Sequence, residues 1–254
     1  MILTERGGPI VTLIINRPEA LNTLTLELIL NLTKEIDRWN AEKEVRVIIL
    51  TGSGDSAFVG GVDVRAMMDL SPDAAERFIT DLHRLFLAIR QSEKIFIASI
   101  NGYALGGGLE LAASCDLRIA SKKARFGMPE VRVGIPSVIE AACLPRLIGL
   151  GRAAEMVYSG EMINAQEAWR IGLVNHLVLH SQLKDATRRL AGKILLNGPQ
   201  AILLQKKLIS QWMELSLSGA IEAGIRAFRD CYETNEPQEG MKAFLEKRKP
   251  SYRH

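Results

Sequence analysis

The sequence predicts an α/β fold that is followed by a helical C-terminal region. Three short runs rich in β-branched residues alternate with two amphipathic segments over the first hundred residues. Strand, helix, strand in this order requires crossover connections, which are typical of layered α/β architecture. From about residue 183 onward the pattern is helical.

The three runs span residues 10–15, 45–50 (VRVIIL) and 95–100 (IFIASI). Each is too short for a helix and is followed by turn residues, so we expect buried strands. Two further strands are expected at 117–120 and 173–178 (LVNHLV).

Two amphipathic helices are expected between the first strands. One spans about 26–39 after the cap residue Thr25, and the other spans 72–90 after the cap residue Ser71. Pro72 fits the first turn of the second helix, because proline is well tolerated there.

The C-terminal helices are separated by turn residues. Gly198 and Pro199 end one helix and begin the next, Gly219 is expected to interrupt that helix, and residues 235–237 precede a last short one. We therefore predict a core of residues 1–195 and a helical region of residues 196–254. This region is small for an independent domain and is expected to pack on another subunit.

Composition excludes several classes of protein. The chain has 254 residues, of which 47% are hydrophobic, and a net charge of +3, so the overall field does not favour nucleic acid. Its three cysteines, Cys115, Cys143 and Cys231, form no C-x-x-C pair, which indicates neither a disulfide framework nor a metal site. With no apolar stretch of about 18 residues and no signal-like N-terminus, we expect a cytoplasmic protein without a membrane partner.

The most informative segment is NGYALGGGLE, residues 101–110. Three consecutive glycines, Gly106, Gly107 and Gly108, lie between a strand and a helical pattern. Without Cβ atoms, the N–H groups at a helix N-terminus can point at an anion or a polarised carbonyl. A tight packing turn between strand and helix is the alternative interpretation.

Two carboxylates accompany this segment. Glu110 falls in the first turn of the helix that the glycines open, where it could simply stabilise the helix end. Glu130 lies on a loop next to Pro129, where it could simply be a solvated surface group. Neither residue alone decides between a structural and a catalytic role.

A second glycine-rich turn follows an earlier strand, in SAFVGGVDVR, residues 56–65. Two such turns can direct two N–H donors at one oxygen, which would form an oxyanion hole. The nearby segment 52–57 matches the dinucleotide fingerprint G-x-G-x-x-A, but no helix pattern starts at its glycines.

Other catalytic motifs are absent from the sequence. There is no zincin, P-loop or nucleophile-elbow motif. His83, His176 and His180 are isolated, and His83 is interpreted as a surface residue because no paired carboxylate is identifiable from spacing.

Taken together, the motifs resemble the enoyl-CoA hydratase (crotonase) family. GDSAFVGGVDVRAM is similar to the family segment A-F-x-A-G-A-D, and NGYALGGGLELAASCDLRIA with ARFGMPEVRVGIP resembles two further signatures. The similarity continues through SGEMINAQEAWRIGLVNHLV to EGMKAFLEKRKPSY, and so covers nearly the whole chain. It implies a crotonase-like fold of repeated ββα units, a C-terminal trimerisation region, and a homotrimer or homohexamer.

The resemblance also implies roles for individual residues. The amides of Val62 and Gly107 would form the oxyanion hole, and Glu110 and Glu130 would be the catalytic glutamates of a hydratase. A set of further residues would contact the substrate: Ala20, Val62, Asp63, Val64, Arg65, Gly106, Gly107, Glu140, Phe228 and Lys247. Of these, Phe228 and Lys247 would meet the nucleotide end of coenzyme A, which is part of the substrate and not a separate cofactor.

The chain departs from the family pattern in two places. Val62 replaces the usual alanine, which keeps the N–H but adds bulk. The segment GIPSVIEAACLPRL replaces a glycine-rich stretch and introduces Glu140. Glu140 could stabilise a helix end or act as a third active-site carboxylate.

The expected activity is the reversible addition of water across the 2,3 double bond of an enoyl-CoA thioester, a hydro-lyase reaction. An isomerase needs only one carboxylate and is the alternative within the family. A non-catalytic RNA-binding homologue is a remote alternative, against which the low net charge and the intact glutamate pair both argue.

Overall fold

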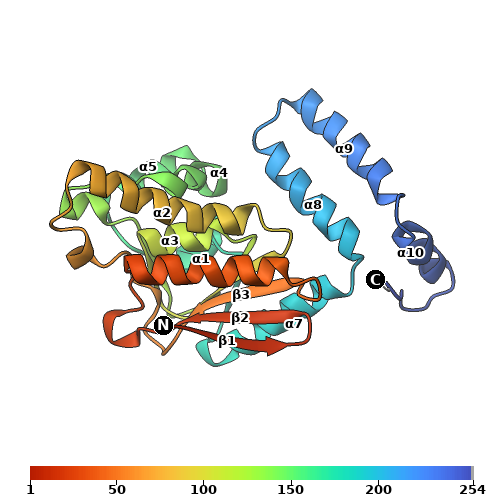
Figure 1. Ribbon diagram of the computed structural model, residues 1–254, viewed down its shortest axis with the longest axis horizontal. Coiled ribbons are helices and arrows are strands. Elements are labelled where there is room, and N and C mark those ends of the chain that lie inside the picture. Colours follow the sequence, from red (N-terminus) through yellow and green to blue (C-terminus); the bar gives the residue numbers. More distant parts are fainter. Residues whose placement is uncertain (253–254) are drawn as a thin grey trace. The chain divides into compact units, whose positions relative to one another are not determined.

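A computed structural model describes residues 1–252 of the chain (Figure 1). These residues form two compact units, Met1–Arg188 and a second unit that begins at Arg189. The first unit holds both sheets, and the second is helical.

The larger sheet of the first unit has six strands, in the order β1-β2-β3-β5-β7-β10. The edge strand β1 is antiparallel to β2, and the other neighbours are parallel. The strands are β1 (Ile2–Gly7), β2 (Ile10–Ile15), β3 (Val47–Gly52), β5 (Ile95–Ile100), β7 (Leu117–Ser121) and β10 (His176–Val178).

A smaller sheet has the order β4-β6-β8-β9. Its strands are β4 (Ala57–Val59), β6 (Tyr103–Leu105), β8 (Arg125–Gly127) and β9 (Ile163–Asn164). The consecutive pairs β3/β4, β5/β6 and β7/β8 each place one strand in each sheet, and a helical segment follows each pair. The repeated ββα units expected from the sequence are therefore present.

Three helices cover one face of the larger sheet (Figure 1). They are α1 (Leu26–Ala41), α2 (Pro72–Arg90) and α3 (Gly107–Ser114). The hydroxyls of Thr25 and Ser71 accept N–H hydrogen bonds at the starts of α1 and α2, as their cap positions predicted. Alternate residues of β2 (Val11, Leu13 and Ile15) are fully buried against these helices.

Short helices complete the first unit: α4 (Leu144–Ile148), α5 (Leu150–Ser159) and α6 (Ala165–Arg170). The 3-10 turns are η1 (Pro18–Ala20), η2 (Val64–Ala66), η3 (Glu130–Val133), η4 (Ile139–Cys143) and η5 (His180–Gln182). Helix α7 (Leu183–Leu195) crosses the boundary between the units, and α8 (Pro199–Trp212), α9 (Leu217–Cys231) and α10 (Glu236–Leu245) lie in the second unit. None of the helices within residues 1–252 is long and apolar enough to span a membrane.

The predicted elements differ from the observed ones at a few boundaries. Strand β3 begins two residues later than expected, and β10 occupies only the last three residues of the segment 173–178. The expectation that Gly219 interrupts a helix is wrong, because Gly219 lies inside α9 and the break falls at residues 213–216. Strand β1 was not predicted, because five of its six residues are exposed and give no apolar pattern.

Gly108 sets how closely α3 approaches the smaller sheet. A Cβ atom on Gly108 would overlap the carbonyl oxygen of Val59 in β4 and would lie 2.8 Å from its carbonyl carbon. Apart from Ala113, every residue of α3 is buried, so the helix cannot shift outward without opening the core.

We therefore expect Gly108→Ala to destabilise the protein by about 1–3 kcal/mol, as overpacking does in other cores. Thermal unfolding followed by circular dichroism measures the effect. Gly151→Ala is the matched control, because Gly151 is a helical glycine and a methyl group added there would have no atom within 4 Å. Equal melting temperatures for the two variants would contradict the close contact between α3 and β4.

Candidate active site

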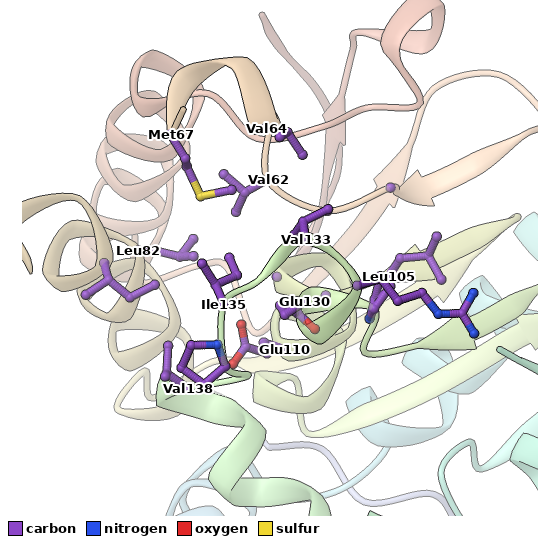
Figure 2. A pocket seen from close by; sticks show the side chains of 18 residues that line it. Val62, Val64, Met67, Leu82, Leu105, Glu110, Glu130, Val133, Ile135 and Val138 are labelled. Atoms are coloured by element: carbon purple, nitrogen blue, oxygen red, sulfur yellow. The ribbon is translucent and has the colours of Figure 1, made fainter. Parts of the chain in front are cut away.

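A cavity of about 210 Å³ opens in the first unit between α2, the start of α3 and the loop that follows β8. Its wall is mostly apolar, and Figure 2 shows Glu110 and Glu130 pointing into it from different segments. The apolar side chains around the two carboxylates include Met67, Leu82, Leu105, Val133, Ile135 and Val138. An apolar pocket with a few convergent polar groups is typical of a ligand site.

The first backbone bend at the cavity contains Val62. Gly61 and Asp63 bond to Leu24 on both sides of Val62: the Leu24 N–H donates to the Gly61 oxygen, and the Asp63 N–H donates to the Leu24 oxygen, each at 2.9 Å. The Val62 N–H makes no hydrogen bond to any residue in the described range 1–252. It is therefore an available donor at the cavity wall.

Asp63 holds this bend in place. Its carboxylate accepts a hydrogen bond from the Arg65 N–H at 3.1 Å and pairs with Arg17 at 2.8 Å. The Arg17 hydrogen bond keeps the pKa of Asp63 below its ordinary value. Asp63 is thus a structural anchor of the bend, and it does not line the cavity.

The second bend contains Gly106 and Gly107. The Gly106 N–H donates to the Gly127 oxygen at 2.9 Å, and helix α3 begins at Gly107. The Gly107 N–H belongs to the first turn of this helix and has no acceptor among residues 1–252. A Cβ atom on Gly107 would lie 3.1 Å from Cγ2 of Val62, so the two bends adjoin and bring both free amides to one wall.

Glu110 lies one turn further along α3 and is 4% exposed. Its Oε1 accepts a hydrogen bond from the Ala141 N–H at 2.8 Å, and its Oε2 lies 4.0 Å from the Cβ position of Gly107. Burial raises the pKa of Glu110 to about 8, opposed by the Ala141 hydrogen bond and supported by the charges of Glu130 and Glu140. Glu110 is therefore mostly protonated at neutral pH.

Glu130 faces the same cavity from η3. Its Oε2 accepts a hydrogen bond from the Ser137 hydroxyl at 2.9 Å, and a Cβ atom on Gly106 would overlap its Oε1. Gly106 has φ +51°, so both its backbone angle and the space beside it favour glycine. Burial raises the pKa of Glu130, against the effect of the Ser137 hydrogen bond. The interpretation of Glu130 as a solvated surface group is therefore wrong.

The remaining residues suggested by resemblance fall into three groups. Val64 lines the cavity with Val62, Gly106 and Gly107, whereas Ala20, Arg65 and Asp63 lie outside its lining. Ala20 ends the turn η1, and Arg65 is exposed in η2. Phe228 and Lys247 belong to the second unit, and their substrate contact stays a prediction.

Glu140 does not line the cavity, and its contact with the substrate stays a prediction. It is 1% exposed, and its Oε1 lies 3.0 Å from Nδ1 of His83 and 3.3 Å from Nη1 of Arg90. His83, for which no paired carboxylate was identifiable from spacing, therefore has Glu140 as a partner. No spacing could have shown these pairs, because the partners are 57 and 50 residues apart.

Sequence reasoning also missed the turn that holds Glu110. Ile139 has φ +41°, a left-handed conformation that is an outlier for a β-branched residue and costs on the order of 1–3 kcal/mol. It lies between Val138, which lines the cavity, and Ala141, which supplies the amide to Glu110. A backbone donor and a strained turn have no sequence signature of their own.

The raised pKa of Glu110 makes a prediction about stability. In the unfolded chain its pKa returns to about its ordinary 4.5, so the folded state loses stability as pH rises from 4.5 to 8. Glu110→Gln keeps an oxygen acceptor for the Ala141 N–H and has no proton to lose. At pH 8.5 we expect the free energy of unfolding of Glu110→Gln to exceed that of the wild type by on the order of 3 kcal/mol, so that the variant unfolds at a higher temperature. Near pH 4.5 the two proteins should be equally stable.

Thermal unfolding between pH 4.5 and 9 measures this difference. Glu155→Gln, at an exposed position on α5, is the control and should follow the wild type at every pH. A Glu110→Gln curve parallel to the wild type across the whole range would show that Glu110 is ionised when buried, against our expectation.

Comparison with known proteins agrees with this geometry. Residues 5–254 match the family model for enoyl-CoA hydratase/isomerase. A crotonyl-CoA hydratase of Syntrophomonas wolfei is 41% identical over 252 residues, covering 99% of this chain and 97% of the relative. A short-chain-enoyl-CoA hydratase of Clostridium acetobutylicum is 39% identical over 249 residues, covering 98% of this chain and 95% of the relative.

The fold comparison gives the same family. The crystal structure of an enoyl-CoA hydratase from Bacillus anthracis superposes with a TM-score of 0.95 at 35% identity, covering 99% of this chain and 98% of that one. The expected crotonase-like α/β fold is thereby confirmed. The chain belongs to the enoyl-CoA hydratase/isomerase family.

Proposed function

We propose that this protein hydrates 2-enoyl-CoA thioesters of short, apolar acyl chains. The observation that carries the proposal is a cavity at which two amides meet two carboxyls. The amides of Val62 and Gly107 have no acceptor among residues 1–252, and the carboxyls are the buried Glu110 and the half-buried Glu130. Relatives named crotonyl-CoA hydratase and short-chain-enoyl-CoA hydratase support the substrate class.

In the proposed mechanism the thioester oxygen accepts hydrogen bonds from the Val62 and Gly107 amides. These donors are in place before negative charge develops on the oxygen, and each is worth roughly 3 kcal/mol in comparable sites. Withdrawal of electrons through the conjugated system makes the β-carbon electrophilic, and water adds to it.

The two glutamates move the protons. The ionised member of the pair takes a proton from the attacking water, and the protonated member delivers a proton to the α-carbon of the enolate. The net change is one water added and no proton gained or lost by the protein. Because two neighbouring carboxyls in an apolar cavity cannot both ionise cheaply, the site supplies one acid and one base at neutral pH, with the proton on Glu110 in the ligand-free state.

The walls of the cavity support a short apolar acyl group. Met67, Ile79, Leu82, Ile135 and Val138 offer no hydrogen bond to a polar chain. Each methylene of an acyl group in such a pocket contributes about 1–3 kcal/mol to discrimination. The proposed reaction uses only protein groups, water and the thioester, so we propose that it needs no separate cofactor or metal.

We further propose that coenzyme A leaves the cavity past Val64 and Arg65, which are both exposed. The protein is proposed to assemble as a homotrimer or homohexamer in the cytoplasm. Support for assembly comes from large apolar side chains on α9 and α10 that are more than half exposed: Leu217, Ile221, Ile225, Phe228, Phe244 and Leu245.

Replacing either glutamate should abolish most of the activity. We expect Glu110→Gln and Glu130→Gln each to lower kcat for crotonyl-CoA by about 10²- to 10⁴-fold, because each removes one partner of the acid–base pair. Loss of absorbance of the conjugated thioester measures turnover, and circular dichroism checks the fold. Glu155→Gln is again the control; turnover near the wild-type rate in either site variant would end the hydratase assignment.

Product analysis separates hydration from isomerisation. A 3-enoyl-CoA has no double bond conjugated with the thioester, so the proposed hydratase should leave it largely unchanged while it converts a 2-enoyl-CoA to hydroxyacyl-CoA. An isomerase would instead convert the 3-enoyl-CoA to the conjugated thioester. Accumulation of 2-enoyl-CoA with no hydroxyacyl product would favour the isomerase alternative.

The pH dependence of kcat/KM should report the proton on Glu110. We expect kcat/KM to fall as pH rises past about 8, because ionisation of Glu110 leaves the pair with no proton to deliver. Initial rates between pH 6 and 10 test this. A profile that stays flat to pH 10 would contradict a protonated Glu110 in the free enzyme.

A further inference from the structure

Glu140 is a fully buried carboxylate near the cavity that the proposed mechanism does not use. Its side chain is 1% exposed, is not part of the cavity lining and contacts two residues of helix α2. Burial of a charge is costly unless it is paired. Glu140 directly precedes Ala141, whose amide bonds to Glu110, so its burial next to this amide points to a role in the site.

The Glu140 contacts join two walls of the active site. His83 and Arg90 are on α2, which also contributes Ile79 and Leu82 to the cavity. Glu140 itself follows the strained residue Ile139 in η4. The pairs at 3.0 and 3.3 Å therefore fix the η4 turn to α2.

The same turn carries the only hydrogen bond to Glu110 from another segment within residues 1–252. The Ala141 N–H donates to Oε1 of Glu110 at 2.8 Å, which leaves Oε2 beside Gly107. If the turn relaxed to remove the strain at Ile139, this amide would move and Glu110 would lose its orientation. Glu140 is the residue in the turn whose side chain is anchored to a different helix.

We propose that Glu140, clamped by His83 and Arg90, is a positioning residue for hydration that holds the strained turn so that the Ala141 amide directs Glu110 into the cavity. The inference rests on the proposed function of Glu110 as one of the two proton carriers. The proposal also gives a function to the segment GIPSVIEAACLPRL, which departs from the glycine-rich stretch of the family. In this segment the Glu140 side chain, paired with α2, holds the turn in place of backbone glycines.

Electrostatics gives the proposal a distinct signature. The charge of Glu140 contributes to the raised pKa of Glu110, and Arg90 pairs with Glu140 as its counter-charge. The other ionisable groups around Glu140 are His83 on α2, Glu110 on α3, and Cys143 of the same turn. Burial raises the pKa of the Cys143 thiol, which also senses Arg90 and Arg146.

Two substitutions should therefore shift, in opposite directions, the pH at which kcat/KM falls on the alkaline side. Glu140→Gln keeps the hydrogen-bonding shape and removes a negative charge near Glu110, so the fall should move to lower pH by about one unit. Arg90→Gln leaves the Glu140 charge less compensated, so the fall should move to higher pH. A purely structural defect would not change sign between the two variants.

A third substitution tests positioning. Glu140→Ala releases the turn, and we expect kcat for crotonyl-CoA to fall at least tenfold with KM changed less than about threefold, whereas Glu140→Gln should retain most of the wild-type kcat. Glu155→Gln serves as the control for loss of a carboxylate elsewhere, and should leave kcat, KM and the profile unchanged.

The outcomes separate this inference from the proposed function. If the wild type hydrates crotonyl-CoA but Glu140→Gln and Arg90→Gln shift the profile in the same direction, or not at all, the inference is overturned. If Glu140→Ala does not fold, the other two variants still decide. If the wild type shows no hydration, the proposed function fails, and the inference is judged in the ligand-free protein. In that case the stability gained by Glu110→Gln is measured against pH, once in the wild type and once in a protein that also carries Glu140→Gln. The gain should reach its full size at a lower pH when Glu140→Gln is present, and an unchanged pH would overturn the inference.

Discussion

The site depends on two backbone N–H groups that the fold leaves without partners. The amides of Val62 and Gly107 lie on adjoining bends, and neither donates to any residue in the range 1–252. Unpaired backbone donors at a protein interior are rare because they cost about as much as a lost hydrogen bond. The fold holds both bends in place: Leu24 bonds to Gly61 and Asp63 on both sides of Val62, and the Gly106 N–H, directly before Gly107, donates to the Gly127 oxygen.

The glutamate pair also lowers the stability of the fold, and its protonation state is needed for the proposed reaction. Burial keeps Glu110 protonated at neutral pH, at the expense of stability in the pH range where the unfolded chain would ionise. Glu130 is brought within reach only because Gly106 has no side chain. The strained backbone of Ile139 and the burial of the Glu140 carboxylate also reduce the stability of the fold, and both lie near the same cavity.

Much of this arrangement could be predicted from the sequence. Cap residues Thr25 and Ser71 marked two helix starts, and β-branched runs marked the strands at 10–15 and 95–100. The two glycine-rich turns indicated where free amides would lie. Edge strand β1 was missed because its exposed residues carry no pattern.

The rest of the site could not be predicted because it depends on contacts between distant segments. The resemblance assigned Glu130 to the site, but only the fold shows that Gly106 leaves room for its carboxylate. The pairing of Glu140 with His83 and Arg90 gave no signal in the sequence, since both partners lie on a helix more than 45 residues earlier. The Ala141 amide that orients Glu110 is a backbone group, and any residue type could supply it except proline.

The most direct test of the central claim is the vibrational frequency of the bound thioester carbonyl. Crotonyl-CoA carrying ¹³C at the carbonyl, bound to a Glu110→Gln/Glu130→Gln double variant that cannot turn it over, isolates this band in an infrared difference spectrum. Two hydrogen bonds from the Val62 and Gly107 amides should weaken the C=O bond and lower its frequency clearly below that of the free thioester in water. A carbonyl frequency equal to or above that of the free thioester would show that the two amides do not bind this oxygen.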